Sequence, residues 1–126
     1  MNGTILVTYA SRAGSTAETA EAIARALERD GANVEVLPMK AVTDLSRYAA
    51  VAAGSAIRGG KWLPEAMEFV RAHRDELGSK PFAAFMVCIT LAMPNSGQYR
   101  AGLAQWMAPV RALVRPVSEG MFAGVL

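Results

Sequence analysis

Three hydroxyl side chains and one glycine fall within the short turn SRAGST (Ser11–Thr16) near the N-terminus. The turn follows the apolar run Thr4–Ala10 and precedes an alanine-rich segment, so it lies between a predicted strand and a predicted helix. The first backbone N–H groups of a helix lack intrahelical partners, and the helix dipole there favours negative charge. Gly14 would let the backbone approach a ligand. The turn can therefore hold a phosphate group without a lysine.

The same turn has an alternative interpretation that requires no ligand. Ser15 and Glu18 have the S-x-x-E spacing of a capping box, in which side chains satisfy the first N–H groups of a helix. The residues of the turn alone leave both interpretations open.

Spacing excludes two other phosphate motifs. The dinucleotide fingerprint G-x-G-x-x-G fails because the turn contains only Gly14. A P-loop requires a hydroxyl directly after its lysine to bind Mg²⁺, and Trp62 follows Lys61 here. Nucleotide hydrolysis is therefore not expected.

A second loop with binding potential is GSAIRGGKW (Gly54–Trp62), after a strand predicted over Ala49–Ala56. In a parallel sheet this loop emerges at the same edge as the first turn. Gly59 and Gly60 permit backbone conformations closed to other residues, and Trp62 offers a flat apolar surface to a planar ring. The alternative is a glycine-rich turn whose tryptophan packs against the following helix.

A third loop, Thr90–Tyr99, follows a strand predicted over Phe82–Thr90 and emerges at that edge as well. Thr90 and Asn95 could hydrogen-bond a heterocycle, but turn formation is the interpretation we favour. His73, the only histidine, falls in the middle of a predicted helix, where a solvated position is expected rather than catalysis. The sequence indicates no catalytic side chain and no metal site.

The elements that position these loops alternate along the chain. Apolar runs predict buried strands, and helical spacing predicts helices, so we expect a three-layer α/β domain with a parallel sheet over residues 1–126. The strands are expected over Thr4–Ala10, Asn33–Met39, Ala49–Ala56 and Phe82–Thr90, with a fifth near Arg115–Val125. Helices are expected before Gly31, over Pro64–Gly78, and over Tyr99–Leu113 with a kink or break at Pro109; only a short one fits Lys40–Tyr48.

Composition narrows the class of protein. A chain of 126 residues with 52% hydrophobic and 19% charged residues suits one domain with a real core. The formal net charge is +2 and the basic residues are scattered, so nucleic-acid binding is not expected. Cys88 alone allows no internal disulfide, and we expect a buried thiol. Without a signal peptide or membrane-spanning run, a cytoplasmic location is the default expectation.

Two of these segments resemble a known family. ILVTYASRAGSTAETAEAIARAL resembles the N-terminal FMN phosphate motif of flavodoxins, S/T-x-T-G-x-T. GSAIRGGKWLPEAMEFV resembles flavodoxin-domain proteins related to menaquinone-dependent protoporphyrinogen IX dehydrogenase, with their loop G-[SA]-x-I-R-x-G-[KH]-[WY]. The likeness covers nearly the whole chain. It implies a flavodoxin-like fold, a five-stranded sheet of order 2-1-3-4-5, and FMN at the carboxyl edge of the strands.

Carried over by position, the resemblance assigns three segments to FMN, and the flavin rather than a side chain carries the chemistry. The phosphate would be held by Ser11, Arg12, Gly14, Ser15 and Thr16, with Ala13 in the same turn. One side of the flavin ring would be flanked by Ala56, Ile57, Arg58, Gly59, Gly60, Lys61 and Trp62. The other side would be flanked by the segment from Thr90, Leu91 and Ala92 to Asn95.

The sequence also departs from the family. Ala13 stands where many flavodoxins have threonine, which removes one phosphate donor, and the charge of +2 differs from the acidic electron carriers. The long C-terminal insertion of the dehydrogenase is absent. No helix is predicted after the fifth strand, so one face of the sheet would expose an apolar patch. A truncated chain, or a homodimer that covers this face, would account for it.

Three functions are carried forward. The first, which we favour, is an FMN-dependent oxidoreductase of the protoporphyrinogen-dehydrogenase-like branch. The second is a single-domain electron carrier, and the third is a non-catalytic domain that has lost FMN. The sequence identifies neither a redox partner nor a small-molecule or quinone acceptor.

Overall fold

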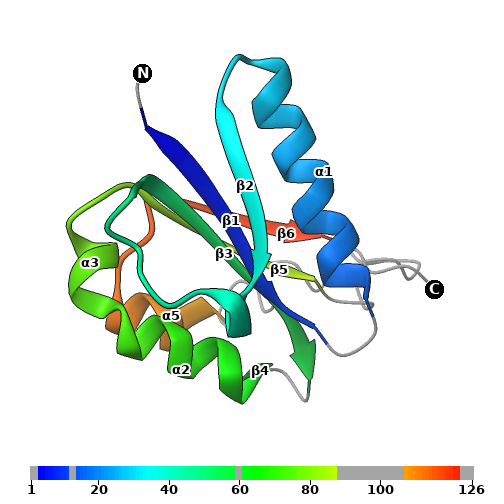
Figure 1. Ribbon diagram of the computed structural model, residues 1–126. Coiled ribbons are helices and arrows are strands. Elements are labelled where there is room, and N and C mark those ends of the chain that lie inside the picture. The colour runs from blue at the N-terminus through cyan, green and yellow to red at the C-terminus, as the bar shows by residue number, and fades with distance from the viewer. Residues whose placement is uncertain (1–2, 12–13, 59–60, 88–106, 123–126) are drawn as a thin grey trace.

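The computed structural model describes residues 3–11, 14–58, 61–87 and 107–122. Strands and helices alternate along the chain, as Figure 1 shows. The elements are β1 (Thr4–Ala10), α1 (Ser15–Arg29), β2 (Asn33–Pro38), the 3-10 turn η1 (Met39–Ala41), β3 (Tyr48–Arg58), β4 (Lys61–Trp62), α2 (Pro64–Ala72), α3 (Arg74–Gly78), β5 (Phe82–Val87), α5 (Ala108–Leu113) and β6 (Ser118–Phe122).

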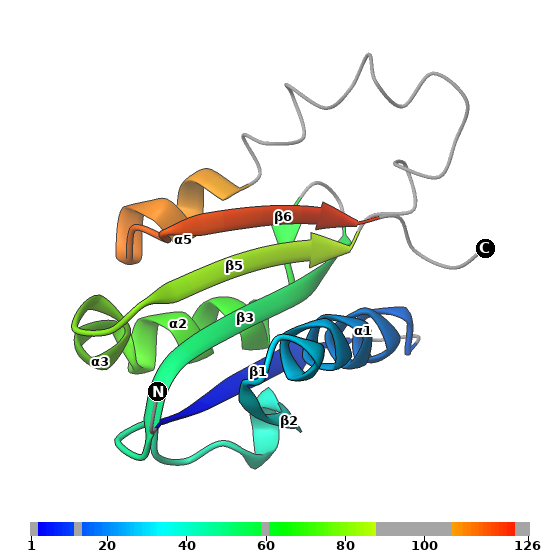
Figure 2. The same cartoon turned by 90° about the horizontal axis from the view of Figure 1, so that it is seen from above.

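The sheet has the strand order β2-β1-β3-β5-β6, and each neighbouring pair on this path is parallel. The two-residue strand β4 stands outside the path and pairs antiparallel with the end of β3. Without β4, the order in chain sequence is 2-1-3-4-5, which confirms the predicted fold. Helix α1 covers one face of the sheet, and α2, α3 and α5 lie on the other (Figure 2).

Alternation along the strands divides the core into two hydrophobic clusters. Leu6 belongs to the larger cluster, with α2, α3 and α5, and its neighbour Val7 belongs to the smaller cluster, with α1. Strand β5 shows the same alternation at Ala84 and Phe85. Continuous apolar runs are needed because both faces of a parallel sheet are covered.

Gly54 fixes the packing between β3 and β5. Its backbone lies so close to the buried ring of Phe85 that a Cβ atom at this position would overlap the ring. Because protein interiors are close-packed, a larger residue here must displace Phe85 or the strand. The start of the second predicted binding loop is therefore firmly held against the sheet.

The helix predicted over residues 64–78 is divided in two, and the prediction of a continuous helix was wrong. His73 has φ −108° and ψ 19°, so it separates α2 from α3 instead of lying inside one helix. Its ring packs at 4.7 Å, centroid to centroid, from that of Phe69. The break keeps Leu77 buried in the larger core as the chain turns toward β5.

Helix α5 begins at Ala108, so Pro109 lies in its first turn, where the missing N–H group costs no helical hydrogen bond. The earlier part of the helix predicted over residues 99–113 lies outside the described residues, as do Cys88 and residues 88–90 of the predicted strand. Strand β2 ends at Pro38, and β3 extends to Arg58, beyond its predicted end.

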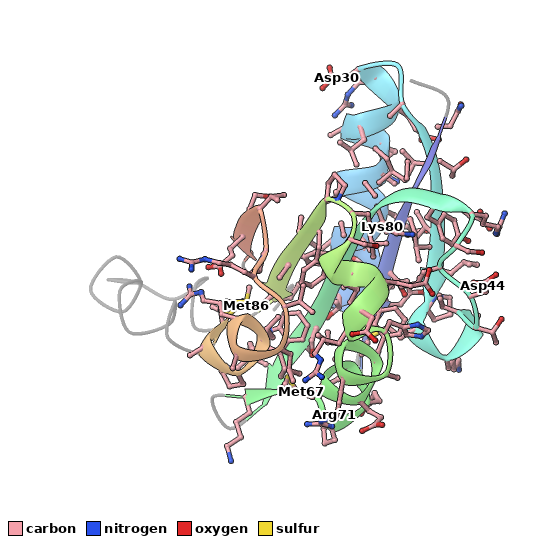
Figure 3. All side chains as sticks on the ribbon, turned by 90° about the vertical axis from the view of Figure 1, so that its left-hand side faces the viewer. Asp30, Asp44, Met67, Arg71, Lys80 and Met86 are labelled. Atoms are coloured by element: carbon pink, nitrogen blue, oxygen red, sulfur yellow. The ribbon has the colours of Figure 1, made fainter. Side chains whose placement is uncertain are left out.

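A partly buried cation, Lys80, links two strand entries at the amino edge of the sheet. The ammonium group of Lys80 donates to the carbonyl oxygens of Leu45 (2.7 Å) and Tyr48 (2.9 Å), which joins the entry to β5 with the entry to β3 (Figure 3). The ammonium group and both carbonyl groups thus have hydrogen-bond partners within the chain, which stabilises this edge of the sheet.

The described residues include no helix after β6. On the α1 face, Phe85 and Val87 are nevertheless buried, and the large hydrophobic side chain found mostly exposed among the described residues is Val117, before β6. The apolar patch expected on this face stays a prediction. No described helix is long and apolar enough to cross a membrane.

Candidate functional site

The turn after β1 leads directly into helix α1. Gly14 is the N-cap of α1, in the left-handed region at φ 90°, and no side chain in the described part of the chain caps the helix. The N–H group of Gly14 donates to Ser11 Oγ at 2.9 Å, and the N–H group of Glu18 donates to the Gly14 carbonyl at 3.1 Å. The alternative interpretation, a capping box of Ser15 and Glu18, does not agree with this geometry, because Gly14 takes the N-cap position and Ser15 is already the first helical residue.

Thr16 places an unsatisfied hydroxyl in this first turn. Its side chain is 1% exposed, and Oγ1 has no hydrogen-bond partner among the described residues. A buried polar group without a partner costs about 1–3 kcal/mol, so native proteins rarely leave one without a reason. An anion at the uncapped end of α1 would accept hydrogen bonds from this hydroxyl and from the free backbone N–H groups. The turn therefore fits a phosphate group.

The second loop starts beside the first, as predicted. Ala10, the last residue of β1, pairs with Ser55 of β3, so both strands send their connections to the same edge. Beyond Ser55 the chain forms a hairpin, with Ile57 opposite Trp62 and Arg58 opposite Lys61. Residues 56–62 are called the β3–β4 hairpin below.

Ser55 is a residue that sequence reasoning missed. It is fully buried; its Oγ accepts from the N–H group of Leu63 at 2.9 Å and donates to the Ala56 carbonyl at 2.7 Å. The signal in the sequence was a hydroxyl within the apolar run Ala49–Ala56, where a buried polar group needs partners.

Trp62 lies in the larger core, 4% exposed, in the same cluster as Ala66 and Phe69 of α2. This arrangement agrees with the alternative in which Trp62 packs against the following helix. Its Nε1 is buried without a hydrogen-bond partner among the described residues, so a donor remains available beside the hairpin. A role of Trp62 at a flavin ring stays a prediction.

The remaining predicted contacts are only partly described. Val87, the last residue of β5, pairs with Ala56, so the carboxyl end of β5 lies next to the start of the β3–β4 hairpin. The third segment predicted to contact the flavin lies outside the described residues. The same holds for four positions in the other two segments and for two side chains. These are Thr90, Leu91, Ala92 and Asn95, then Arg12, Ala13, Gly59 and Gly60, and the side chains of Ser15 and Arg58.

A hollow of about 670 Å³ opens at the same edge, on the β2 side of β1. Its position follows from the connection between β2 and β3, which forms only the short turn η1 there and leaves part of this layer unfilled. Residues of β1, η1 and α2 surround it: Tyr9, Ala10, Ser11, Pro38, Met39, Lys40, Glu65, Glu68, Phe69 and Ala72. Ser11 thus borders both the hollow and the turn. The described residues contain no group of three acidic, cysteine or histidine side chains that could hold a metal.

The strand order reverses between β1 and β3, and ligands of open α/β sheets bind at the carboxyl edge of such a switch point. The turn before α1 lies at that edge, so the fold defines a doubly wound α/β protein with a candidate site at its switch point. A family model described as a flavodoxin domain matches residues 6–126. The chain belongs to this flavodoxin domain family. No curated protein matches it.

Solved structures share the fold. A flavodoxin from the domain Archaea is 25% identical with a TM-score of 0.66, and covers 95% of this chain and 84% of its own. A flavodoxin from Streptococcus pneumonia is 19% identical with a TM-score of 0.71, covering 98% and 86%. Rubredoxin oxygen:oxidoreductase from Desulfovibrio gigas is 21% identical with a TM-score of 0.64, covering 98% of this chain. The chain spans only 31% of that last protein's length.

Proposed function

We propose that the protein binds FMN and acts in electron transfer. The observation that carries the proposal is the buried, unpartnered hydroxyl of Thr16 in the uncapped first turn of α1. The phosphate of FMN would accept hydrogen bonds from Thr16 Oγ1, from the first backbone N–H groups of α1, and from Ser11. Bound FMN would supply the redox chemistry, and the protein would supply binding, orientation and electrostatics.

The β3–β4 hairpin would lie along one side of the flavin ring. Its start is fixed by Gly54 against Phe85, and its end is fixed where Leu63 leads into α2. Arg58 to Lys61 would then supply backbone groups at the ring, and the segment from Thr90 to Asn95 would cover the other side. The proposal assigns no catalytic side chain.

Two roles are compatible with FMN binding, and different observations favour them. The hairpin sequence GSAIRGGKW supports an oxidoreductase of the protoporphyrinogen-dehydrogenase-like branch, as does the net charge of +2. The extent of the likeness to flavodoxins, with 84% of the archaeal protein covered, supports a single-domain electron carrier. We rank the electron carrier level with the oxidoreductase, because the branch resemblance depends on one loop.

We place a small-molecule redox partner in the hollow beside Ser11. Its volume is within the range of sites for small molecules, and its lining includes the buried apolar residues Ala10, Met39 and Phe69. A homodimer across the α1 face beside β5 and β6 remains a prediction, and light scattering with and without FMN would measure it.

Titration of FMN with the purified protein tests the proposal. Saturable quenching of flavin fluorescence at one FMN per chain is expected, and a titration without saturation would exclude FMN binding. Stepwise reduction of the complex separates the two roles. Two resolved one-electron steps would favour the carrier, and a single two-electron step would favour the oxidoreductase.

A further inference from the structure

Ser55 ties the two ends of the β3–β4 hairpin together. Its hydroxyl accepts a hydrogen bond from Leu63, which follows the hairpin, and donates one to Ala56, which begins it. The side chain is 0% exposed, so water cannot replace either partner. A buried hydroxyl is thus the polar link between the end of β3 and the start of α2, since Leu63 is the N-cap of α2.

The backbone pairing within the hairpin is short, although Trp62 at its end is buried in the larger core and Ala56 and Ile57 pack against that core. Strand β4 has only two residues, and two strand pairs, Ile57 with Trp62 and Arg58 with Lys61, close the hairpin. Isolated pairs of this length are not stable by themselves. Without the Ser55 bond, the N–H group of Leu63 would be left unsatisfied in the interior, and the hairpin could move relative to β3.

We propose that Ser55 is a positioning residue, which holds the β3–β4 hairpin in the shape that FMN requires without touching FMN. This inference rests on the proposed function. A binding loop that is ordered before the ligand arrives avoids the loss of conformational entropy on binding, so preorganisation raises affinity. The serine acts through the backbone of Leu63, and its hydroxyl matters more than its volume.

The test compares Ser55→Ala, which removes the hydroxyl, with Ser55→Thr, which retains it. Ser55→Ala is expected to weaken FMN binding about tenfold, because one buried donor loses its partner. The amide of Leu63 is expected to exchange with deuterium faster, and the visible spectrum and fluorescence quenching of bound FMN are expected to change. Ser55→Thr is expected to restore both the affinity and the slow exchange.

A matched control separates positioning from general destabilisation. Val51 lies in the same strand, is 1% exposed, and is four residues away, at the amino edge. Val51→Ala is expected to lower the melting temperature at least as much as Ser55→Ala. Its affinity for FMN should stay within about twofold of the parent, since distant sites behave independently.

The outcomes distinguish this inference from the proposed function. If the parent protein does not bind FMN, the proposed function fails, and faster exchange at Leu63 in Ser55→Ala still tests the structural link. If the parent binds FMN and Ser55→Ala binds it equally tightly, the positioning role is wrong. If Val51→Ala weakens FMN binding as much as Ser55→Ala, the effect is one of stability, and the positioning role is wrong as well. If Ser55→Thr does not fold, the amide exchange and spectrum of Ser55→Ala against Val51→Ala decide.

Discussion

The two connections at the carboxyl edge of the sheet satisfy their polar groups in opposite ways. After β1, the described residues provide no side-chain cap for the N-terminus of α1 and no partner for the buried hydroxyl of Thr16. After β3, the buried hydroxyl of Ser55 has a donor and an acceptor within 3 Å. The first turn therefore carries groups that an anion would satisfy, whereas the Ser55 hydroxyl at the second connection already has both partners and supplies shape. Removing a hydroxyl should accordingly affect binding at the first and order at the second.

The largest expected effect is on FMN binding at the first turn. Replacing Ser11 and Thr16 together by alanine should weaken FMN binding about 100-fold or more, because two hydrogen bonds to a charged phosphate are lost. The melting temperature without FMN should fall only slightly, because Thr16 Oγ1 has no partner among the described residues and the bond that Ser11 Oγ accepts from the Gly14 N–H group is exposed. Calorimetric titration and thermal unfolding measure the two quantities. Unchanged affinity would show that these hydroxyls do not hold the phosphate.

The next largest effect is expected on stability, at Gly54, just before the second connection begins. Gly54→Ala should lower the free energy of unfolding by about 2–3 kcal/mol, because the added methyl group overlaps the buried ring of Phe85. Urea unfolding measures this loss. The double variant Gly54→Ala with Phe85→Leu should recover part of it, and a parent-like stability of Gly54→Ala alone would contradict the packing described.

A smaller effect is expected at the N-cap of α1. Gly14 has φ 90°, so Gly14→Ala should cost about 1 kcal/mol of stability from backbone strain. Gly14→Asn should cost less, because asparagine tolerates the left-handed region. Chemical denaturation of the two variants gives the comparison, and equal stabilities would indicate that the left-handed cap is not retained in solution.

The smallest effect is expected at the ion pair of Arg111 and Glu119, which lies away from both connections and serves as a reference. Hydrogen bonds from Arg111 lower the pKa of Glu119 below its ordinary value of 4.5. The ion pair therefore stabilises the fold above that pH, and its contribution is lost as pH falls through the lower pKa of the folded state. Both side chains are partly exposed, so Glu119→Gln should cost less than about 1 kcal/mol at pH 7. The stabilities of parent and variant should converge as the pH is lowered through the pKa of the folded state; a difference that grows on acidification would contradict this sign.

The sequence predicted the strand order and the meeting of the two turns, because apolar runs and helical spacing depend on local residues and on burial. It did not predict that Gly14 rather than Ser15 caps α1, since the S-x-x-E spacing carries no information on backbone angles. The break at His73 was hidden within a continuous helical pattern.

Ser55 was missed for a different reason. A serine among alanines and glycine is consistent with a small, buried strand, and its partner Leu63 becomes apparent only when the hairpin is folded back on β3. Lys80 is a similar case, because its two carbonyl partners lie more than 30 residues away in the sequence. Polar contacts that form only when the chain folds back on itself are the feature that local sequence patterns do not reveal.

The phosphate turn is the central claim, and a comparison of FMN with riboflavin tests it most directly. Riboflavin has the same ring system and lacks the phosphate, so both ligands would meet the β3–β4 hairpin alike. Fluorescence titration of the parent protein should show saturable binding of FMN, about 100-fold or more tighter than that of riboflavin, because charge-assisted hydrogen bonds to the phosphate are absent with riboflavin. Equal affinities, or no saturable binding of FMN, would contradict the account.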